Sequence, residues 1–327
     1  METLLAISHL KKYFDVPAGR LHAVDDVSFS IQRGETLGVV GESGCGKSTL
    51  GRVLLGLHQA TSGDIVFQGM DLSTFTKEEM IPVRREMQII FQDPYASLDP
   101  RFTVAQIVEE PLKLHKVYKS AEERRARVEH LMEMVGLPKR AYNLYPHEFD
   151  GGRRQRIVIA RALAINPKFV VCDEPVSALD VSVQAQILNL MIDLQKQLGL
   201  TYMFISHDLS VVKHISDNVV VMYLGQVIEK APKRDLFKTP MHPYTIALLS
   251  AIPSINVREK RQRIILKGEL SSPINPGEGC RFAKRCPFAK PECFSITPEY
   301  RELASEHFAA CHRAEEVRDG ALKYETS

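Results

Sequence analysis

The chain has 327 residues, 44% of them hydrophobic, with 42 Lys and Arg against 40 Asp and Glu. This length and composition predict a globular protein with a sizeable core and exclude a largely disordered chain. The near balance of charge gives no argument for a strongly basic face, so we expect no nucleic acid to bind and any anion site to be local.

The N-terminal segment predicts a β-rich opening without an export signal. It lacks a basic region followed by an apolar one and soon meets Lys11 and Lys12, so we expect the protein to remain in the cytosol. The apolar runs are far shorter than the roughly 20 residues that span a bilayer, so membrane association would depend on a partner. Residues 23–31 alternate with a period of two, which predicts a half-buried antiparallel strand.

A glycine-rich loop follows the next predicted strand. Residues 36–40 are a continuous apolar run, and residues 48–55 have a helical pattern. Between them, Gly41-Glu42-Ser43-Gly44-Cys45-Gly46-Lys47-Ser48 fits a phosphate-binding loop, in which backbone N–H groups and a helix N-terminus face the phosphates. Lys47 would reach the β and γ phosphates and Ser48 would coordinate Mg²⁺. The alternative, an ordinary glycine turn, is disfavoured by the flanking strand and helix.

The middle of the chain changes pattern twice. Residues 94–160 contain charged amphipathic segments, notably 121–132, and we interpret them as a helical insertion. Afterwards short apolar runs alternate with helix-like segments such as 183–197, which predicts a parallel sheet. These runs are residues 169–172, 202–205 and 218–222.

The first of these runs ends in two acidic residues, Asp173 and Glu174. A Mg²⁺-orienting carboxylate belongs at the end of a buried strand beside a phosphate-binding loop, so Asp173 is the candidate metal-side residue. Glu174 is the candidate base that orients and partly deprotonates the attacking water. Alone, the pattern would more often be a buried strand followed by a capped helix, but the upstream loop reverses that preference.

From Tyr13 to about Asp217 the sequence resembles the ATP-binding-cassette family, whose landmarks are all present in order. The resemblance implies an α/β fold: a P-loop cassette ATPase with an antiparallel β subdomain, a RecA-like parallel-sheet core and a helical subdomain. It also implies that Tyr13 stacks on adenine, that Gln92 senses Mg²⁺ and the membrane partner, and that His207 holds the γ-phosphate. A single Tyr, Gln or His is usually structural, so these roles rest on the resemblance.

The loop and the resemblance together imply one set of site residues. Catalysis would depend on Lys47, Glu174 and His207, and Mg²⁺ would be held through Ser48, Gln92 and Asp173. The segment 177–180 would cross the interface of an ATPase dimer. The residues expected to bind ATP are Tyr13, Gly41, Ser43, Gly44, Cys45, Gly46, Lys47, Ser48, Thr49, Gln92 and His207.

One landmark departs from the family, whose signature is usually Leu-Ser-Gly-Gly-Gln. Here the chain has Phe149-Asp150-Gly151-Gly152-Arg153, and the resemblance implies that residues 150–153 bind ATP held by an opposite subunit. Asp150 would set a carboxylate against phosphate, and unit charges about 4 Å apart repel by about 4 kcal/mol at an effective dielectric of about 20. Arg153 would compensate. We hypothesise that this site is slower or differently tuned; in the alternative, Asp150 turns away and caps the following helix.

The C-terminal part resembles the oligopeptide and dipeptide importer subfamily. Residues 241–253 resemble the segment that closes its ATPase domain, and the cysteine-bearing end has the same likeness. We therefore expect an ATP-binding cassette over residues 1–255, with its helical subdomain at about 94–160, and a small Cys-rich C-terminal appendage over 256–327. A charged linker would cover 257–263. The appendage has little helical or strand periodicity, which favours a metal-stapled structure.

Four of the six cysteines crowd into the C-terminal region, at Cys280, Cys286, Cys293 and Cys311. In a reducing cytosol such a group favours metal binding over disulfides. The spacing lacks the two-residue knuckles of common zinc sites. Some members of the subfamily carry a four-iron cluster here, so the resemblance implies a [4Fe–4S] cluster that staples the tail, with Zn²⁺ or unligated thiols as alternatives. Cys45 and Cys172 occupy nucleotide-site positions and would take no part.

The resemblance implies an ATPase subunit that binds and hydrolyses ATP to drive import of a small solute through a membrane transporter. Di- and oligopeptides are the commonest cargo, although nickel and oligosaccharide importers share the pattern. The implied partners are a second ATPase subunit in a heterodimer, two integral membrane permease subunits and, indirectly, an extracytoplasmic solute-binding protein. The chain would lie peripherally on the cytoplasmic face of the membrane.

Two other functions are weaker alternatives. A soluble cassette ATPase of DNA repair, translation or iron–sulfur assembly is disfavoured by the neutral charge and by the lack of a second cassette or a long coiled-coil insertion. A binding module that has lost catalysis is disfavoured because Lys47, Asp173, Glu174 and His207 are all retained.

Overall fold

The computed structural model describes residues 2–252, 264–266, 268, 272–322 and 324. The chain divides into two units. The helical unit contains Gln32–Glu35 and Thr74–Ile205 together with the first residues of the chain, and the strand-rich unit contains Thr3–Ile31, Thr36–Ser73 and Ser206–Ser327. The linker expected over 257–263, and with it the boundary expected at 255–256, lies outside the described residues.

Three parallel strands form the sheet of the helical unit. β6 (Met87–Ile90) pairs with β7 (Phe169–Asp173), which pairs with β8 (Thr201–Ile205). Every residue of β7 and β8 is buried, as expected for continuous apolar runs in a parallel sheet. α6 (Val181–Leu198) connects these two strands and ends at Gly199, which adopts a φ of 65°. The two strands and the helix predicted in this part of the chain are confirmed.

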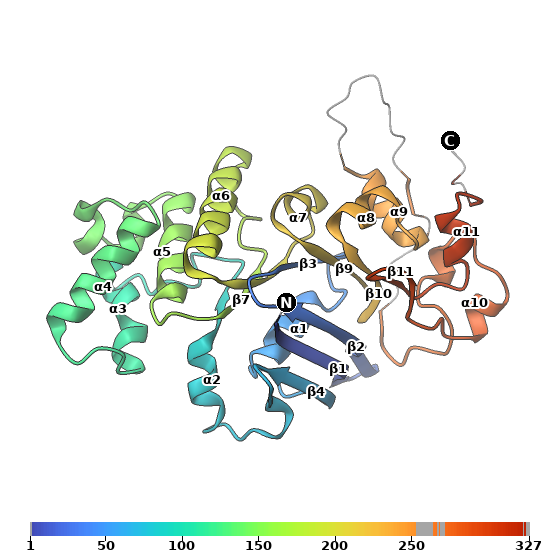
Figure 1. Cartoon of the computed structure of the whole chain (residues 1–327), viewed down its shortest axis with the longest axis horizontal. Coiled ribbons are helices and arrows are strands. Elements are labelled where there is room, and N and C mark those ends of the chain that lie inside the picture. Colours follow the sequence, from blue (N-terminus) through green and yellow to red (C-terminus); the bar gives the residue numbers. More distant parts are fainter. Residues whose placement is uncertain (1, 253–263, 267, 269–271, 323, 325–327) are drawn as a thin grey trace. The chain divides into compact units, whose positions relative to one another are not determined.

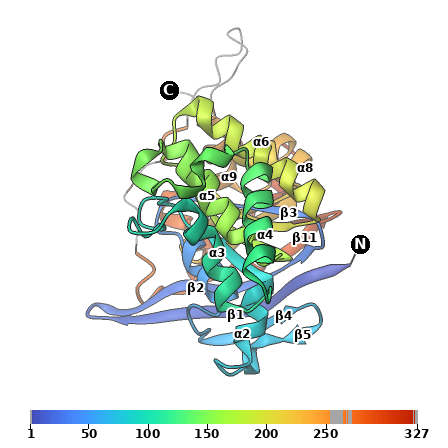
Figure 2. The same ribbon diagram turned by 90° about the vertical axis from the view of Figure 1, so that its left-hand side faces the viewer.

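Three further helices of this unit pack together, α3 (Val104–Leu114), α4 (Ala121–Met134) and α5 (Gly151–Leu163) (Figures 1 and 2). Each begins at a side chain that accepts a backbone N–H of the first turn, and in α3 and α4 the bond is returned to complete a capping box. Among the described residues, none of the helices combines the length and apolar character needed to cross a bilayer. Shorter elements complete the unit: α2 (Met80–Glu86), η2 (Lys139–Asn143) and η3 (Pro146–Glu148).

A four-stranded sheet opens the strand-rich unit, with the order β2-β1-β4-β5. β4 pairs antiparallel with both β1 and β5, which confirms the antiparallel, β-rich opening. The two long strands β1 and β2 lie side by side in Figure 2. The elements are β1 (Thr3–Val16), β2 (Gly19–Gln32), β4 (Ser62–Phe67), β5 (Met70–Asp71) and the turn η1 (Leu72–Thr74).

The second sheet to which this unit contributes contains both parallel and antiparallel strand pairs. β3 (Thr36–Val40) pairs parallel with β9 (Asn218–Tyr223), and β9 pairs antiparallel with β10 (Gln226–Pro232). β3 leads through the glycine-rich loop into α1 (Lys47–Leu54), as predicted. The other helices here are α7 (Leu209–Ile215), which packs against β3, α8 (Lys233–Lys238) and α9 (Pro243–Ser250).

The small Cys-rich appendage expected from the sequence is not distinguished as a unit of its own, because the described part of the C-terminal region belongs to the strand-rich unit. β12 (His307–Ala309) pairs with β10 and with β11 (Arg301–Ala304), so the sheet of the strand-rich unit continues into this region. β12 supplies hydrogen-bond partners to a strand that would otherwise expose its edge. The weak periodicity of the sequence reflects very short elements, which also include η4 (Ala283–Arg285), α10 (Glu292–Ser295) and α11 (Ala314–Arg318).

Candidate functional site

The predicted site residues fall in both units, and each unit holds its own group. The strand-rich unit contains the glycine-rich loop, Tyr13 and His207. The helical unit contains Gln92, the segment 150–153 and the acidic pair at the end of β7. The C-terminal cysteines belong to the strand-rich unit.

The glycine-rich loop turns sharply between β3 and α1. Gly46 adopts a φ of 104°, and a Cβ there would lie 2.0 Å from the carbonyl oxygen of Ala23, so only glycine fits. Lys47, Ser48 and Thr49 form the first turn of α1, directly after the loop. The predicted order of strand, loop and helix is therefore confirmed, and the positive N-terminal end of the helix lies beside the loop.

The side chain of Lys47 folds back into this loop. Its ammonium donates hydrogen bonds to the carbonyl oxygens of Gly41 at 2.8 Å and Glu42 at 3.0 Å, and the residue is 5% exposed. Cys45 is buried beside it, and this burial raises the pKa of the thiol. The positive charge of Lys47 is thus held within the curve of the loop.

Tyr13 lies on β1 among polar and aromatic neighbours. Its ring stacks on that of His22, with centroids 3.9 Å apart, and the guanidinium carbon of Arg20 lies 4.8 Å from its centroid. Its hydroxyl donates to Asp25. Burial, followed by that hydrogen bond, raises the pKa of Tyr13 well above its ordinary value. The phenol is therefore neutral and its ring is oriented by contacts that the sequence did not indicate.

His207 follows a residue that is tied to β3. The N–H of Ser206 donates to the carbonyl oxygen of Val39 at 3.1 Å. Asp208 then accepts the N–H of Ser210 at 2.7 Å and begins α7, leaving His207 exposed between the two anchors. Because Val39 lies two residues before the glycine-rich loop, His207 is placed near the carboxyl end of β3, where that loop starts.

In the helical unit, the structure brings Gln92 and Glu174 together. The amide Nε2 of Gln92 lies 3.2 Å from Oε2 of Glu174. Glu174 adopts a φ of 49°, and its N–H donates to the carbonyl oxygen of Ile205 at 3.0 Å. A left-handed backbone at a residue other than glycine costs about 1–3 kcal/mol and is concentrated at functional sites. Asp173, which precedes it at the end of β7, is 4% exposed.

The residues that differ from the family signature lie at the start of α5. Asp150 accepts the N–H of Arg153 at 2.8 Å and is the N-cap of the helix, which is the alternative considered from the sequence. The Nε of Arg153 lies 3.5 Å from the same carboxylate. A Cβ on Gly152 would lie 2.5 Å from a methyl carbon of Val183, so a side chain there would force a shift. The carboxylate of Asp150 is therefore already engaged by the first turn and by Arg153.

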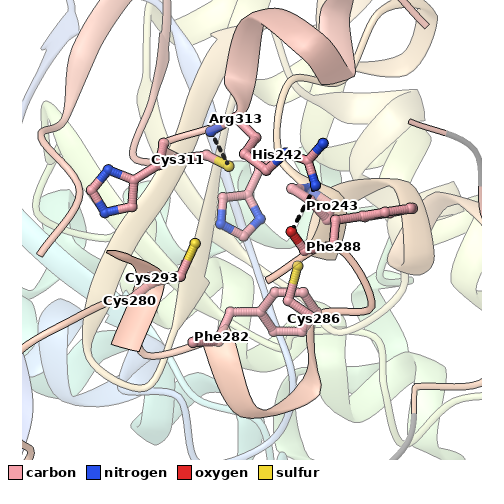
Figure 3. Close-up of a pocket in the computed structure, with 11 residues that line it drawn as sticks. His242, Pro243, Cys280, Phe282, Cys286, Phe288, Cys293, Cys311 and Arg313 are labelled. Carbon is pink, nitrogen blue, oxygen red and sulfur yellow. Dashed lines mark hydrogen bonds between the residues drawn. The ribbon is translucent and has the colours of Figure 1, made fainter. Parts of the chain in front are cut away.

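The four C-terminal cysteines line one pocket around the imidazole of His242 (Figure 3). The other cysteines contribute to the raised pKa of Cys311, after burial as the main cause, so the thiols lie within electrostatic reach of one another. Burial also raises the pKa of Cys286 to about 11 and lowers that of His242 to about 3. Among the described residues, however, no three His, Cys, Asp or Glu side chains are grouped closely enough to hold a metal ion.

Two ion pairs beside the loop were missed by sequence reasoning. Arg285 forms an ion pair with Glu42, and Arg281 forms one with Asp25. The only sequence signal was the position of both arginines between Cys280 and Cys286, which does not reveal their partners. These contacts join parts of the chain more than two hundred residues apart.

Comparison with known proteins matches two families to this chain. Residues 24–177 match the family described as ABC transporter, and residues 228–293 match the oligopeptide/dipeptide transporter C-terminal region. The oligopeptide transport ATP-binding protein AppF of Bacillus subtilis (strain 168) is 53% identical over 321 residues, covering 95% of this chain and 97% of that protein. The oligopeptide transport ATP-binding protein OppF of the same organism is 51% identical, covering 96% and 98%.

Solved structures show the same fold over most of the chain. A dimeric post-hydrolysis state of the ATP-binding cassette MJ0796, bound to ADP and Pi, superposes with a TM-score of 0.65 at 29% identity and covers 71% of this chain and 99% of that one. The structure of cbiO1 from Clostridium perfringens, part of a cbiONQ transporter complex, gives a TM-score of 0.66 at 28% identity, covering 73% and 92%.

Proposed function

Because the chain belongs to the ABC transporter ATPases of the oligopeptide/dipeptide class, we propose that it hydrolyses ATP to drive import of di- or oligopeptides through a membrane transporter. The observation that carries the proposal is the glycine-rich loop, which holds the ammonium of Lys47 in its curve and leads directly into α1. Relatives that match along almost the whole chain are transport proteins, which disfavours a soluble ATPase of DNA repair, translation or iron–sulfur assembly.

The proposal assigns each polar group a task in hydrolysis. Residues 41–49 bind the phosphates, with Lys47 on the β and γ phosphates. Mg²⁺, when bound, would be held through Ser48, Asp173 and Gln92 and would neutralise charge on the phosphates. Glu174 orients and partly deprotonates the attacking water, supported by its strained backbone and its hydrogen bond with Gln92. The ring of Tyr13 stacks on adenine, and His207 holds the γ-phosphate.

The proposed assembly follows from the family. Residues 1–255 are the ATP-binding cassette, with the helical subdomain at about 94–160, and residues 256–327 are its C-terminal extension. The chain works on the cytoplasmic face of the membrane with a second ATPase subunit and two permease subunits, and an extracytoplasmic solute-binding protein delivers the peptide. Residues 150–153 act on ATP held by the other ATPase subunit.

The test is transport by the reconstituted complex. Glu174→Gln should bind ATP normally but reduce ATP hydrolysis and labelled-peptide uptake by about 10²-fold or more, because the general base is lost. Lys47→Ala should lose ATP binding itself. Glu78→Gln changes an exposed glutamate of the unit that contains Glu174, and this variant should match the wild type in both assays. Uptake of peptide by the Glu174→Gln complex at the wild-type rate would contradict the proposal.

The signature with Asp150 is proposed to make one of two ATP sites slower or differently tuned. In support, a carboxylate stands at a position expected to meet phosphate; against it, the same carboxylate is already used as an N-cap. Asp150→Ser keeps the cap and removes the charge. A change in hydrolysis by the assembled complex is expected, and an unchanged rate would remove the asymmetry.

We also propose that the four C-terminal cysteines bind a metal group, a [4Fe–4S] cluster in preference to Zn²⁺. Support comes from the thiol-rich donor set and from the pocket that Cys280, Cys286, Cys293 and Cys311 share. Against it, the described side chains are not grouped closely enough to hold a metal ion, so the thiols would have to move together on binding. A cluster would supply covalent cross-links between parts of the tail. Since burial raises the pKa values of the Cys286 and Cys311 thiols, metal binding must displace their protons, so affinity should fall as the pH is lowered.

Metal content decides this proposal. The full-length protein is purified without oxygen, and its iron, sulfide and zinc are measured together with its visible absorption. Iron and sulfide in equal amounts, lost on Cys286→Ser, are the expected result. Zinc alone would replace the cluster by a zinc site, and no metal would leave four reduced thiols.

A further inference from the structure

The segment between Cys280 and Cys286 is anchored to the surroundings of the glycine-rich loop. Phe282 is 1% exposed and makes edge contacts with the rings of Tyr223 and Tyr244, at centroid distances of 5.4 Å each. Tyr244 is buried in turn, and its hydroxyl accepts the N–H of Glu42 at 2.9 Å. The aromatic cluster therefore connects the cysteine segment with the second residue of the loop.

Arg285 makes a direct contact with the loop. Its two terminal nitrogens lie 2.6 and 3.1 Å from the two carboxylate oxygens of Glu42, which is a bidentate pair. The side chain of Arg285 is only 9% exposed, so the pair is not one of the solvated surface pairs that contribute little. Glu42 carries the acidic charge of residues 41–48, where a triphosphate is expected, and a carboxylate without a partner would repel that ligand.

Arg281 makes a second contact on the side of Tyr13. Its guanidinium donates to a carboxylate oxygen of Asp25 and to the carbonyl oxygen of Leu224. Asp25 also accepts the hydroxyl of Tyr13, and its N–H donates to Gly225 at 2.8 Å. The N–H of Gly225 donates to Cys45 at 2.9 Å, so this second set of bonds returns to the same loop.

We propose that Arg285 and Arg281 are positioning residues for ATP, through which the cysteine-bearing C-terminal segment sets the affinity of the glycine-rich loop. Arg285 neutralises Glu42 and holds the loop open toward phosphate, and Arg281 fixes Asp25 and thereby Tyr13. Because both arginines lie between two cysteines, a change in the conformation of that segment displaces both contacts. The inference rests on the proposed phosphate site at residues 41–48.

The experiment measures equilibrium binding of a fluorescent ATP analogue to the purified full-length chain. Arg285→Gln should weaken binding about tenfold, since the charge of Glu42 is then uncompensated. In a Glu42→Gln background the same substitution should weaken binding less than about twofold, because the charge to be compensated is gone. Arg285→Lys keeps the charge but cannot form the bidentate pair, so its affinity for the analogue should lie between those of the wild type and Arg285→Gln.

Matched variants separate this effect from general damage to the C-terminal segment. Arg301→Gln removes an arginine of the same region that pairs with Glu315 at 2.7 Å, and it should leave binding unchanged. Equal weakening by Arg285→Gln in both Glu42 backgrounds would overturn the proposal, because a merely structural role predicts additivity.

The outcome also distinguishes this inference from the proposed function. If Lys47→Ala abolishes binding and Arg285→Gln does not weaken it, the phosphate site stands and the positioning role is wrong. If Lys47→Ala binds the analogue as tightly as the wild type, the proposed phosphate site itself is wrong.

Discussion

The helical segment 104–163 and the C-terminal segment 272–322 are held together by different kinds of contact. In the first, helix starts are closed by side chains three residues away, such as Thr103 with Gln106 and Ser120 with Glu123. In the second, short elements depend on polar contacts with residues far away in the chain, such as the ion pair of Arg281 with Asp25 and the hydrogen bond between His307 and Glu229. Local contacts are visible in a sequence pattern, whereas distant contacts require the fold.

The contrast predicts that the most damaging substitution lies at the buried pair of the C-terminal region. Glu229 is fully buried and accepts the N–H groups of Met241 and His242 as well as the ring of His307. Glu229→Ala would strand all three donors, so we expect a loss of about 3–5 kcal/mol in the free energy of unfolding, measured in urea.

Glu278→Ala is the matched control, because Glu278 is an exposed glutamate of the same unit and should change stability by less than about 0.5 kcal/mol. Similar losses of unfolding free energy in the two variants would contradict the importance of distant contacts, since the buried pair would then contribute no more than a solvated side chain.

Two glycines with positive φ, one in each segment, test the same difference between local and distant contacts. Gly279 precedes the first C-terminal cysteine with a φ of 97°, and a Cβ there would lie 2.7 Å from backbone carbon of Phe294. Gly136 follows α4 with a φ of 71°, and its Cβ would meet only the end of the Arg156 side chain at 2.9 Å. Both alanine variants suffer the left-handed strain of about 1–2 kcal/mol. Gly279→Ala should unfold at lower urea than Gly136→Ala, because only the arginine can move aside.

A smaller effect is expected at a helix start. Ser120 accepts the N–H of Glu123 at 3.0 Å and begins α4. Ser120→Ala should lower the free energy of unfolding by about 1 kcal/mol. Ser120→Asp should lower it much less, because aspartate is also a good N-cap. The two variants compared by chemical denaturation test whether the helical segment depends on local bonds; equal losses in both would argue against it.

The smallest effect at neutral pH concerns the protonation of Asp25. Burial alone would raise the pKa of Asp25, but hydrogen bonds from Tyr13 and His22 and the charge of Arg281 outweigh it, so the pKa lies below its ordinary 3.8. A lowered carboxyl pKa contributes stability above that value, which is lost as the pH falls through the folded-state pKa. The stability difference between the wild type and Asp25→Asn should therefore be constant near neutrality and shrink below about pH 4, as followed by acid unfolding.

Much of the glycine-rich loop in the strand-rich unit could be predicted from the sequence. Residues 36–40 are apolar throughout, and the glycines that follow are required by backbone geometry, as Gly46 shows. The N-cap role of Asp150 was available as an alternative because capping is a local bond. The hydrogen bond between Gln92 and Glu174 joins two strand ends 82 residues apart, and no spacing rule predicts it.

The C-terminal region shows where such prediction stops. The sequence shows its four cysteines, but it does not show that β12 continues the sheet of β10. A three-residue strand is too short for its periodicity to be recognised, and its pairing is decided by the open edge of another strand.

The cassette family and the strand–loop–helix order around Lys47 follow from the amino-acid sequence, because each depends on neighbouring residues and on backbone geometry. Only the tertiary structure decided that Arg281 and Arg285 reach Asp25 and Glu42, and that the C-terminal strands join the sheet. Ion pairs and strand edges select partners by distance in space, and that distance is set by the packing of the whole unit.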